Sequence, residues 1–367
     1  MNLEKKGVVV LDLPPGEGNP RNSEGAFLEL RDGRLMFAYS RFVGRSHSDD
    51  AVAQIVARYS RDGGETWSED EVIDTPDRHG ALNLMSVSIL RLNNGDIGLF
   101  YVVRYGWHDT RLRLFRSSDE GKTWSDPVVC VPGPGYYVTN NDRVVRLSSG
   151  RLVVPAALHK MRSDSTTDWR SFDSRGTVYV YLSDDDGRTW REANNAVALH
   201  VRHTRSGLQE PGIVELANGV LWMYCRTDLG RQYEAFSWDG GETWSAPEPS
   251  QFTSPCSPLS VKRNPHTGHL LAVWNPIPDY TGRRIERHSW GRTPLIGAIS
   301  RDEGATWESH FALETEEDRG GYCYTAIHFT DEAVLFAYCA GEPEDGICLS
   351  RLRIRKVPLA EVDPQGK

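Results

Sequence analysis

Short runs of apolar residues, each ending in a turn signal, recur along the chain. Ala26–Leu30 is followed by Asp32-Gly33 and then by Leu35–Tyr39. Apolar runs of this length, bounded by Asp-Gly, Asn-Gly or Ser-Gly, are typical of antiparallel strands joined by tight turns. The same arrangement pairs Ser86–Leu92 with Ile97–Val103, Arg143–Leu147 with Leu152–Ala156, Gly212–Leu216 with Val220–Cys225, and Pro258–Lys262 with Leu270–Trp274.

A third run follows each pair and leads into the motif Ser-x-Asp-x-Gly-x-Thr-Trp. The first copy extends from Ser60 to Trp67, and successive motif tryptophans lie 57, 66, 54 and 63 residues apart. The Asp of the motif can accept hydrogen bonds from its own turn, and the Gly supplies a positive φ. We therefore interpret these aspartates as structural residues, whose hydrogen bonds hold the turn between a third and a fourth strand. The other copies begin at Ser117, Ser183, Ser237 and Ser300.

Four antiparallel strands in roughly 60 residues correspond to one blade of a β-propeller. A sixth unit lacks the motif, and its strands are expected at Tyr324–Phe329, Ala333–Tyr338 and Ile347–Ile354. Val8–Leu13 is the natural candidate for its missing outer strand. The sequence thus predicts an all-β fold, a six-bladed β-propeller of four-stranded antiparallel blades closed by the N-terminal strand. One domain is expected over residues 1–367.

Composition and charge exclude several classes of function. The net charge is −9 with no basic run, which argues against nucleic-acid binding. The longest apolar runs, such as Ile97–Val103, reach about a third of the ~20 residues of a membrane helix, so no membrane association is expected. No signal peptide is visible, which predicts a cytoplasmic protein if Met1 is the native start. The oligomeric state stays open.

The six cysteines form no C-x-x-C pair and no metal-ligand spacing. Four of them fall inside apolar runs, where free Cys behaves as a small buried hydrophobe. We expect reduced core cysteines, no metal site and no cofactor.

Candidate functional residues lie where propeller loops open on one face, before the first strand of a unit and between its second and third strands. Arginines from different units gather there, and Arg pairs rigidly with carboxylates, which favours an anionic small-molecule substrate. The candidates at the mouth are Arg21, Glu24, Arg41, His108, Asn141, Arg226 and Arg292.

Five such motifs, known as Asp boxes, on a six-unit chain resemble the sialidase (neuraminidase) superfamily. The resemblance covers essentially the whole chain. It implies a six-bladed propeller whose site has three arginines binding the sugar carboxylate, a Tyr nucleophile paired with a Glu, and an Asp acid/base.

The fourth unit resembles the family most closely. Glu210 is followed by the strand Gly212–Leu216 and then by a strand that ends in Arg226. By this resemblance Glu210 corresponds to the partner of the tyrosine, and Arg226 to the second arginine. Arg21 takes the place of the first arginine, although Asn22-Ser23 follows it where the family has Ile-Pro.

The segment from His288 to Ala298 resembles the one that carries the third arginine. Arg292 is assigned there, with Arg283 and Arg284 as alternatives. Gly320-Gly321-Tyr322-Cys323 resembles the segment of the nucleophile, which makes Tyr322 the preferred tyrosine. Tyr324, two residues on, is expected to share its face of the strand.

The run from Asp49 to Arg58 resembles the family's segment that carries the Asp acid/base, and either Asp49 or Asp50 takes that role. Arg41 resembles the arginine that the family has beside this loop. The resemblance implies an exo-glycoside hydrolase that releases a terminal acidic sugar, sialic acid or a related one, with retention of configuration. A tyrosine suits this task because a carboxylate nucleophile would approach the substrate's own carboxylate. Two alternatives are a glycosidase for a different acidic sugar and a non-catalytic carbohydrate-binding propeller.

Overall fold

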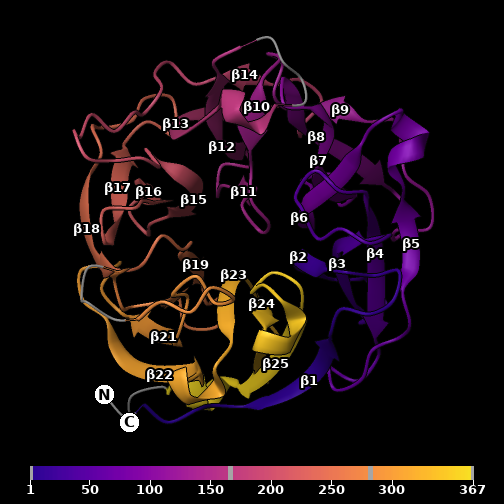
Figure 1. The fold of residues 1–367 in the computed structure, drawn as a ribbon, viewed down its shortest axis with the longest axis vertical. Helices are drawn as coiled ribbons and strands as arrows, with labels where there is room; N and C mark the ends of the chain where they lie inside the picture. The colour runs from indigo at the N-terminus through magenta and orange to yellow at the C-terminus, as the bar shows by residue number, and fades with distance from the viewer. Residues whose placement is uncertain (1–2, 164–167, 280–283, 365–367) are drawn as a thin grey trace.

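The structure, a computed structural model, describes residues 3–163, 168–279 and 284–364. These residues form five β-sheets that stand around a central axis, with β2, β6, β11, β15, β19 and β23 nearest the centre (Figure 1). The coarse prediction of an all-β fold built from four-stranded antiparallel sheets is confirmed for four of these sheets.

Three of the sheets follow chain order from the centre outward. Their strands are β2 (Asn22–Glu29), β3 (Leu35–Phe42), β4 (Ala53–Ser60) and β5 (Glu71–Asp74); β15 (Gln209–Glu215), β16 (Leu221–Arg226), β17 (Arg231–Ser237) and β18 (Glu248–Thr253); and β19 (Ser260–Arg263), β20 (Leu270–Trp274), β21 (Leu295–Ser300) and β22 (Glu308–Glu314).

The second and third units share one nine-stranded sheet, which differs from the predicted separate blades. The short strand β10 joins them because it pairs antiparallel with β12 and parallel with β8. The strands are β6 (Asn83–Arg91), β7 (Ile97–Gly106), β8 (Asp109–Ser117), β9 (Val128–Val129), β10 (Tyr136–Val138), β11 (Val145–Arg146), β12 (Leu152–Met161), β13 (Phe172–Ser183) and β14 (Arg191–Glu192).

The last sheet joins the two ends of the described chain. Its order is β1-β25-β24-β23, and β1 pairs antiparallel with β25 (Figure 1). The expectation that Val8–Leu13 supplies the outer strand of the sixth unit is therefore confirmed. The strands are β1 (Val8–Leu13), β23 (Gly321–Phe329), β24 (Ala333–Gly341) and β25 (Leu352–Pro358), followed by the single helical turn α1 (Leu359–Val362).

Four innermost strands contain a β-bulge. In β2, β6, β15 and β23 the pairing register shifts, and one residue other than glycine adopts a left-handed backbone. These residues are Glu24 (φ 57°), Ser86 (φ 64°), Glu210 (φ 48°) and Tyr324 (φ 59°). A bulge interrupts the alternation of side chains and turns one of them in a new direction. The strands β2 and β15 also begin earlier than predicted, at Asn22 and Gln209, because they continue across the bulge.

Each Ser-x-Asp-x-Gly-x-Thr-Trp copy forms the same turn between the third and fourth strands of a unit. In the first copy Asp62 accepts hydrogen bonds from the amide and hydroxyl of Thr66 and from Ser60, and the Trp67 indole donates to the Gly64 carbonyl at 3.2 Å. The corresponding Asp–Thr and Asp–Ser bonds are present in the other four copies. The structural interpretation of these aspartates agrees with this geometry.

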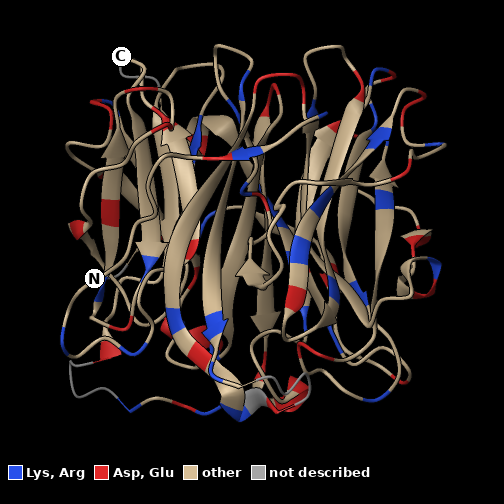
Figure 2. Ribbon diagram, turned by 90° about the horizontal axis from the view of Figure 1, so that it is seen from above, with Lys and Arg blue, Asp and Glu red and all other residues tan. Residues whose placement is uncertain are grey.

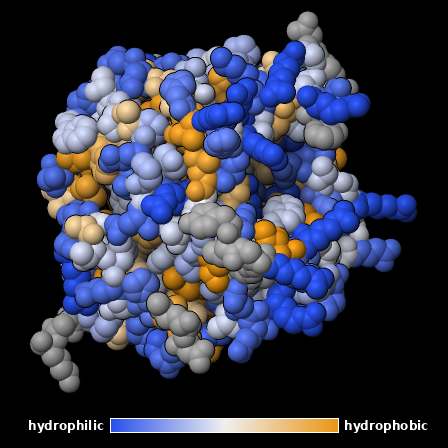
Figure 3. Space-filling view, turned by 60° about the vertical axis from the view of Figure 1, so that its left-hand side comes forward, coloured by the Kyte–Doolittle hydropathy of each residue, from blue (hydrophilic) through white to orange (hydrophobic). Residues whose placement is uncertain are grey.

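The core lies between neighbouring sheets. Met36 packs toward the strands of the next unit, whereas the adjacent Phe37 packs with Leu335 of β24 on the opposite side. Successive residues of a strand point to opposite faces, so each sheet is covered on both. The outside is polar: acidic and basic positions are interspersed over the loops (Figure 2), and the face in Figure 3 is mainly hydrophilic. Among the described residues, no helix is both long and apolar enough to cross a membrane.

The motif aspartates predict a loss of stability in acid. Hydrogen bonds from Thr66 and Ser60 lower the pKa of Asp62 from 3.8 to about 2. A carboxylate with a lowered folded-state pKa stabilises the fold above its unfolded pKa, and this stabilisation is lost as the pH falls from about 4 toward 2. Asp62→Asn should therefore lower the Tm at pH 7 by about 1–3 °C, and the difference should narrow at pH 2. Thermal denaturation followed by circular dichroism measures both, with Asp331→Asn at an exposed turn as the control. An Asp62→Asn deficit that is equal at both pH values would contradict the assignment.

Candidate active site

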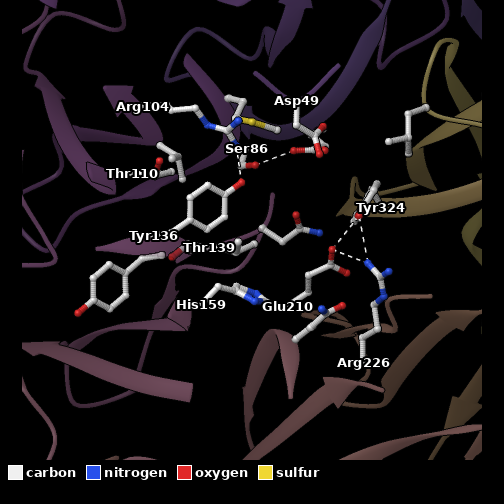
Figure 4. Close-up of a pocket in the computed structure, with 18 of the residues that line it drawn as sticks. Asp49, Ser86, Arg104, Thr110, Tyr136, Thr139, His159, Glu210, Arg226 and Tyr324 are labelled. Atoms are coloured by element: carbon white, nitrogen blue, oxygen red, sulfur yellow. Dashed lines mark hydrogen bonds and ion pairs between the residues drawn. The ribbon is translucent and has the colours of Figure 1, made fainter. Parts of the chain in front are cut away.

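A cavity of about 240 Å³ opens at the axis, where the four bulge residues meet. Glu24, Ser86, Glu210 and Tyr324 all line it, and they come from four different innermost strands. Loops and strand ends complete the wall (Figure 4). The further lining residues used below are Asp49, Arg104, Thr110, Tyr136, His159, Phe172, Arg226, Trp290 and Arg292.

Tyr324 and Glu210 form a buried hydrogen-bonded pair. The Tyr324 hydroxyl donates to Glu210 Oε1 at 2.7 Å, and Arg226 Nη1 donates to the same oxygen at 2.7 Å (Figure 4). Burial, and then the charge of Glu210, raise the pKa of Tyr324 well above its usual value. Glu210 Oε2 is buried with no hydrogen-bond partner among the described residues. The phenol is therefore neutral at rest, and a carboxylate lies in position to take its proton.

Two guanidinium groups flank this pair. Arg292 is 2% exposed and lies over the rings of Tyr324 and Trp290, with its carbon 5.4 and 5.0 Å from their centroids. It donates to Cys323 Sγ at 3.1 Å, and Arg226 Nε donates to Cys256 Sγ at 3.2 Å. In the described part of the chain Arg226 is paired with the Glu210 carboxylate, whereas Arg292 contacts the Cys323 sulfur and no carboxylate. Two guanidinium groups therefore face one carboxylate, so this end of the cavity favours an anion.

Arg21 is held by two carboxyl groups. Its Nη1 donates to Asp49 Oδ1 at 2.6 Å, and its Nη2 donates to Glu24 Oε1 at 3.0 Å. Glu24 Oε2 in turn accepts from the Ser86 hydroxyl at 2.6 Å. Arg21 itself is behind these groups and does not line the cavity. Of the three predicted carboxylate-binding arginines, the structure thus brings Arg226 and Arg292 to the cavity, but not Arg21.

The two carboxyl groups differ in their protonation. Burial raises the pKa of Glu24 to about 7, although Arg21 opposes the shift. For Asp49, desolvation acts in the same upward direction, but the guanidinium groups of Arg21, Arg104 and Arg292 together outweigh it and lower the pKa below its ordinary value. Asp49 lies on the loop between β3 and β4, and its side chain is 57% exposed. At neutral pH Asp49 is ionised and Glu24 is close to half protonated.

Arg104 at the end of β7 was not predicted. It is 4% exposed and donates to the Tyr136 hydroxyl, while its Nε and Nη1 have no acceptor among the described residues. Figure 4 places it across the cavity from Arg226. A signal was available, because Arg104 ends the second strand of its unit as Arg41 and Arg226 end theirs.

An aromatic wall stands beside Arg104. The Tyr136 ring packs against Trp107 and Phe172 at centroid distances of 5.2 Å, and Phe172 stacks on His159 at 4.7 Å. Burial lowers the pKa of His159, so its imidazole is neutral at pH 7. This side of the cavity offers flat apolar faces to a ligand.

The structure moves the candidate nucleophile from Tyr322 to Tyr324. Tyr322 is fully buried, accepts a hydrogen bond from the Gly320 amide at 3.2 Å and packs against Tyr338. It does not line the cavity, and the expectation that both tyrosines share one face is wrong. The reason is the bulge after Cys323, where the left-handed backbone of Tyr324 interrupts the alternation.

Four other predicted residues do not line the cavity. Arg41 is instead 3.5 Å from Asp70. Asn141 is buried and donates to the carbonyls of Gly25 and Tyr324, so it holds two inner strands together. Asp50 and His108 are exposed on their loops.

The alternatives for the third arginine are also placed by the structure. Arg284 is exposed and paired with Glu286 at 3.2 Å, outside this cavity. Arg283 lies outside the described residues.

The described residues contain no group of three or more His, Cys, Asp or Glu side chains that could hold a metal ion. All six cysteines are free, and five of them are buried, as the sequence predicts.

Comparison with known proteins identifies the family. The model of the BNR repeat-like domain matches residues 33–336, most of the chain. The chain belongs to the BNR repeat-like domain family. This match, with the relatives below, confirms the predicted membership of the sialidase superfamily.

The relatives of this BNR repeat-like chain include sialidases. A sialidase of Bacteroides fragilis is 29% identical over 244 residues, covering 62% of this chain and 40% of the relative. The anhydrosialidase of Macrobdella decora is 30% identical over 244 residues, covering 59% of this chain and 27% of the relative. The chain therefore spans less than half the length of either protein. The crystal structure of the NanB sialidase of Streptococcus pneumoniae has the same fold, with a TM-score of 0.71 at 13% identity, covering 98% of this chain and 71% of that one.

The buried Arg226–Glu210 pair predicts a strong energetic coupling. Arg226→Met leaves Glu210 without its cation and should lower the free energy of unfolding by about 3 kcal/mol. The double variant Arg226→Met/Glu210→Gln removes the uncompensated charge and should recover more than half of that loss. Urea denaturation of the wild type, both single variants and the double variant measures the coupling. Losses that simply add would contradict a direct pair.

Proposed function

We propose that this protein is a retaining exo-glycoside hydrolase that releases a terminal acidic sugar, sialic acid or a related one. The observation that carries the proposal is the Tyr324–Glu210 hydrogen bond of 2.7 Å beneath Arg226 and Arg292. Membership of a family whose relatives include sialidases supports the same reaction.

The arrangement suits a sugar that carries its carboxylate on the anomeric carbon. Arg226 and Arg292 bind that carboxylate and so place the anomeric carbon next to Tyr324. A carboxylate nucleophile would be repelled there, whereas a neutral phenol is not. Glu210 takes the phenolic proton as the Tyr324 oxygen attacks. A glycosyl–tyrosine intermediate forms, and water then releases the sugar with retained configuration.

The far end of the cavity receives the rest of the sugar ring. Arg104 provides unpartnered N–H groups for an acceptor on the ring, and the wall of Tyr136 and Phe172 packs against its apolar face. Arg21 does not complete a triad of arginines, and Arg104 is an additional cation. In these two respects the cavity differs from the three-arginine site that the resemblance implies. We therefore propose acidic sugars in general as the substrate class, and not one particular sialic acid.

We also propose that the six units close into a six-bladed β-propeller of one domain. The β1–β25 pairing and the position of all six innermost strands around one axis support this arrangement. Closure matters for function because the cavity takes residues from several units at once.

The two tyrosines distinguish the proposed chemistry from sugar binding alone. Tyr324→Phe should lower kcat/KM on a fluorogenic sialoside by about 10³-fold or more, because it removes the attacking oxygen. Tyr322→Phe should retain nearly full activity, since its hydroxyl accepts from the Gly320 amide and Tyr322 does not line the cavity. Calorimetry with free sialic acid checks that Tyr324→Phe still binds sugar. An active Tyr324→Phe variant would overturn the mechanism, and a wild type that binds acidic sugars without cleaving any would favour a carbohydrate-binding protein.

A further inference from the structure

Two carboxyl groups share the Arg21 guanidinium, and both line the cavity. Arg21 Nη1 is 2.6 Å from Asp49 Oδ1, and its Nη2 is 3.0 Å from Glu24 Oε1. The hydrolysis proposed above needs a proton donor for the leaving oxygen, and the inference that follows rests on that proposed function. The family resemblance implied Asp49, or its neighbour Asp50, for this step.

The geometry separates the roles of the two groups. Glu24 occupies the left-handed bulge of β2, the position that Glu210 and Tyr324 occupy on β15 and β23, and it is 3% exposed. Asp49 is on a loop, is 57% exposed, and makes the shorter contact with Arg21. The carboxyl group that the inner strand fixes at the wall of the cavity is therefore that of Glu24.

The hydrogen bonds of Glu24 also locate its proton. Oε1 faces an N–H donor of Arg21, which leaves no room for a second proton there. Oε2 lies 2.6 Å from the Ser86 hydroxyl, a group that can donate or accept. The proton of a neutral Glu24 is therefore on Oε2, beside a second residue that lines the cavity.

We propose that Glu24 is the proton donor of the reaction, and that Asp49 is a positioning residue that neutralises Arg21 and fixes it beside Glu24. When the surroundings of two neighbouring carboxyl groups move their pKa values apart, one group stays protonated and can act as an acid while the other stays ionised. Glu24, with a pKa of about 7, and Asp49, with a lowered pKa, fit that pattern.

The steps balance as follows. The phenolic proton of Tyr324 passes to Glu210 while the Tyr324 oxygen bonds to the anomeric carbon. The bond from that carbon to the leaving oxygen breaks, and this oxygen takes the proton of Glu24 Oε2. Water then attacks the anomeric carbon and gives a proton to the Glu24 carboxylate. The carbon–Tyr324 bond breaks, and the tyrosine recovers its proton from Glu210.

Charged and titratable groups on several elements act on Glu24. Arg21 favours its ionised form, whereas Asp49 on the β3–β4 loop and Glu210 across the cavity favour its protonated form. Tyr136 of β10 and Cys339 of β24 also interact with its charge. Removing the charge of Asp49 therefore favours ionisation of Glu24 and lowers its pKa.

Dependence on the leaving group tests the role of Glu24. A general acid typically contributes 10²–10⁴-fold, and it matters most when the leaving oxygen is poorly acidic. Glu24→Gln should lower kcat/KM on sialyl-lactose by about 10²–10⁴-fold, and on a 4-methylumbelliferyl sialoside by less than about tenfold. Asp49→Asn should affect both substrates to a similar extent.

The pH profile on sialyl-lactose is the second measurement. The wild type should lose activity as the pH rises through about 7, where Glu24 loses its proton. Asp49→Asn should shift this alkaline limb to lower pH, and Glu24→Gln should abolish it. The matched control is Glu234→Gln, because burial raises the pKa of Glu234 to about 7 but Glu234 does not line the cavity. That control should keep the wild-type limb.

Each alternative has its own outcome. If Asp49→Asn shows the leaving-group selectivity and Glu24→Gln does not, the acid is Asp49 and the inference is overturned. If Glu24→Gln loses activity equally on both substrates while keeping its Tm, Glu24 is not the proton donor. If the wild type cleaves neither substrate, sialoside hydrolysis itself fails, which the wild-type assay reveals before any variant is compared.

Discussion

The left-handed bulge of the innermost strands is the constraint on which the site depends. A regular strand would alternate its side chains between the two covered faces of its sheet, and no side chain would point along the axis. At Glu24, Ser86, Glu210 and Tyr324 the backbone departs from that alternation, at a conformational cost of about 1–3 kcal/mol per residue. Four side chains of three chemical kinds thereby meet in one cavity, although they are up to 300 positions apart in the sequence. Asn141 stabilises the arrangement, because its amide joins the backbone of β2 and β23 next to two of these bulges.

The cavity also separates its charges. Arg226 and Arg292 lie at the end with Tyr324, and Arg104 lies across from Arg226 (Figure 4). Arg21 lies behind Glu24 and Asp49, with which it is paired. Because buried charges interact strongly, the partner of each arginine decides what that arginine can still bind. Arg292 contacts no carboxylate among the described residues and is available to an anion, Arg226 shares Glu210 with Tyr324, and Arg21 is paired with two carboxyl groups. The net charge of −9 is therefore a property of the outer surface and does not describe the cavity.

Prediction from the sequence succeeded where a residue interacts mainly with its neighbours in the chain. The motif Asp and Thr residues bond only within their own turn, so their role follows from spacing alone. Glu210 and Arg226 were found because they flank two adjacent strands of one unit. Tyr322 was preferred because the segment around it resembles that of the family's nucleophile, and strand alternation predicted Tyr324 on the same face. The bulge after Cys323 instead turns Tyr324 alone into the cavity. Arg104 was missed although it ends the second strand of its unit as Arg41 and Arg226 do, and its two N–H groups without an acceptor became visible only in the folded chain.

The sequence by itself determined the strand repeat, the stapled turns, the N-terminal strand that completes the last sheet, and the residue types that a sialidase-like site requires. The strand repeat and the turns depend on interactions within about 60 residues, or on the periodicity of side chains along a strand. The N-terminal strand was inferred from the strand missing in the last unit, and the site residue types from the family resemblance. Only the tertiary structure decided which tyrosine faces Glu210, which arginines reach the cavity, and for which carboxyl group burial raises the pKa. These outcomes depend on single-residue shifts of register and on burial by distant strands, and both arise only when the sheets pack around their common axis.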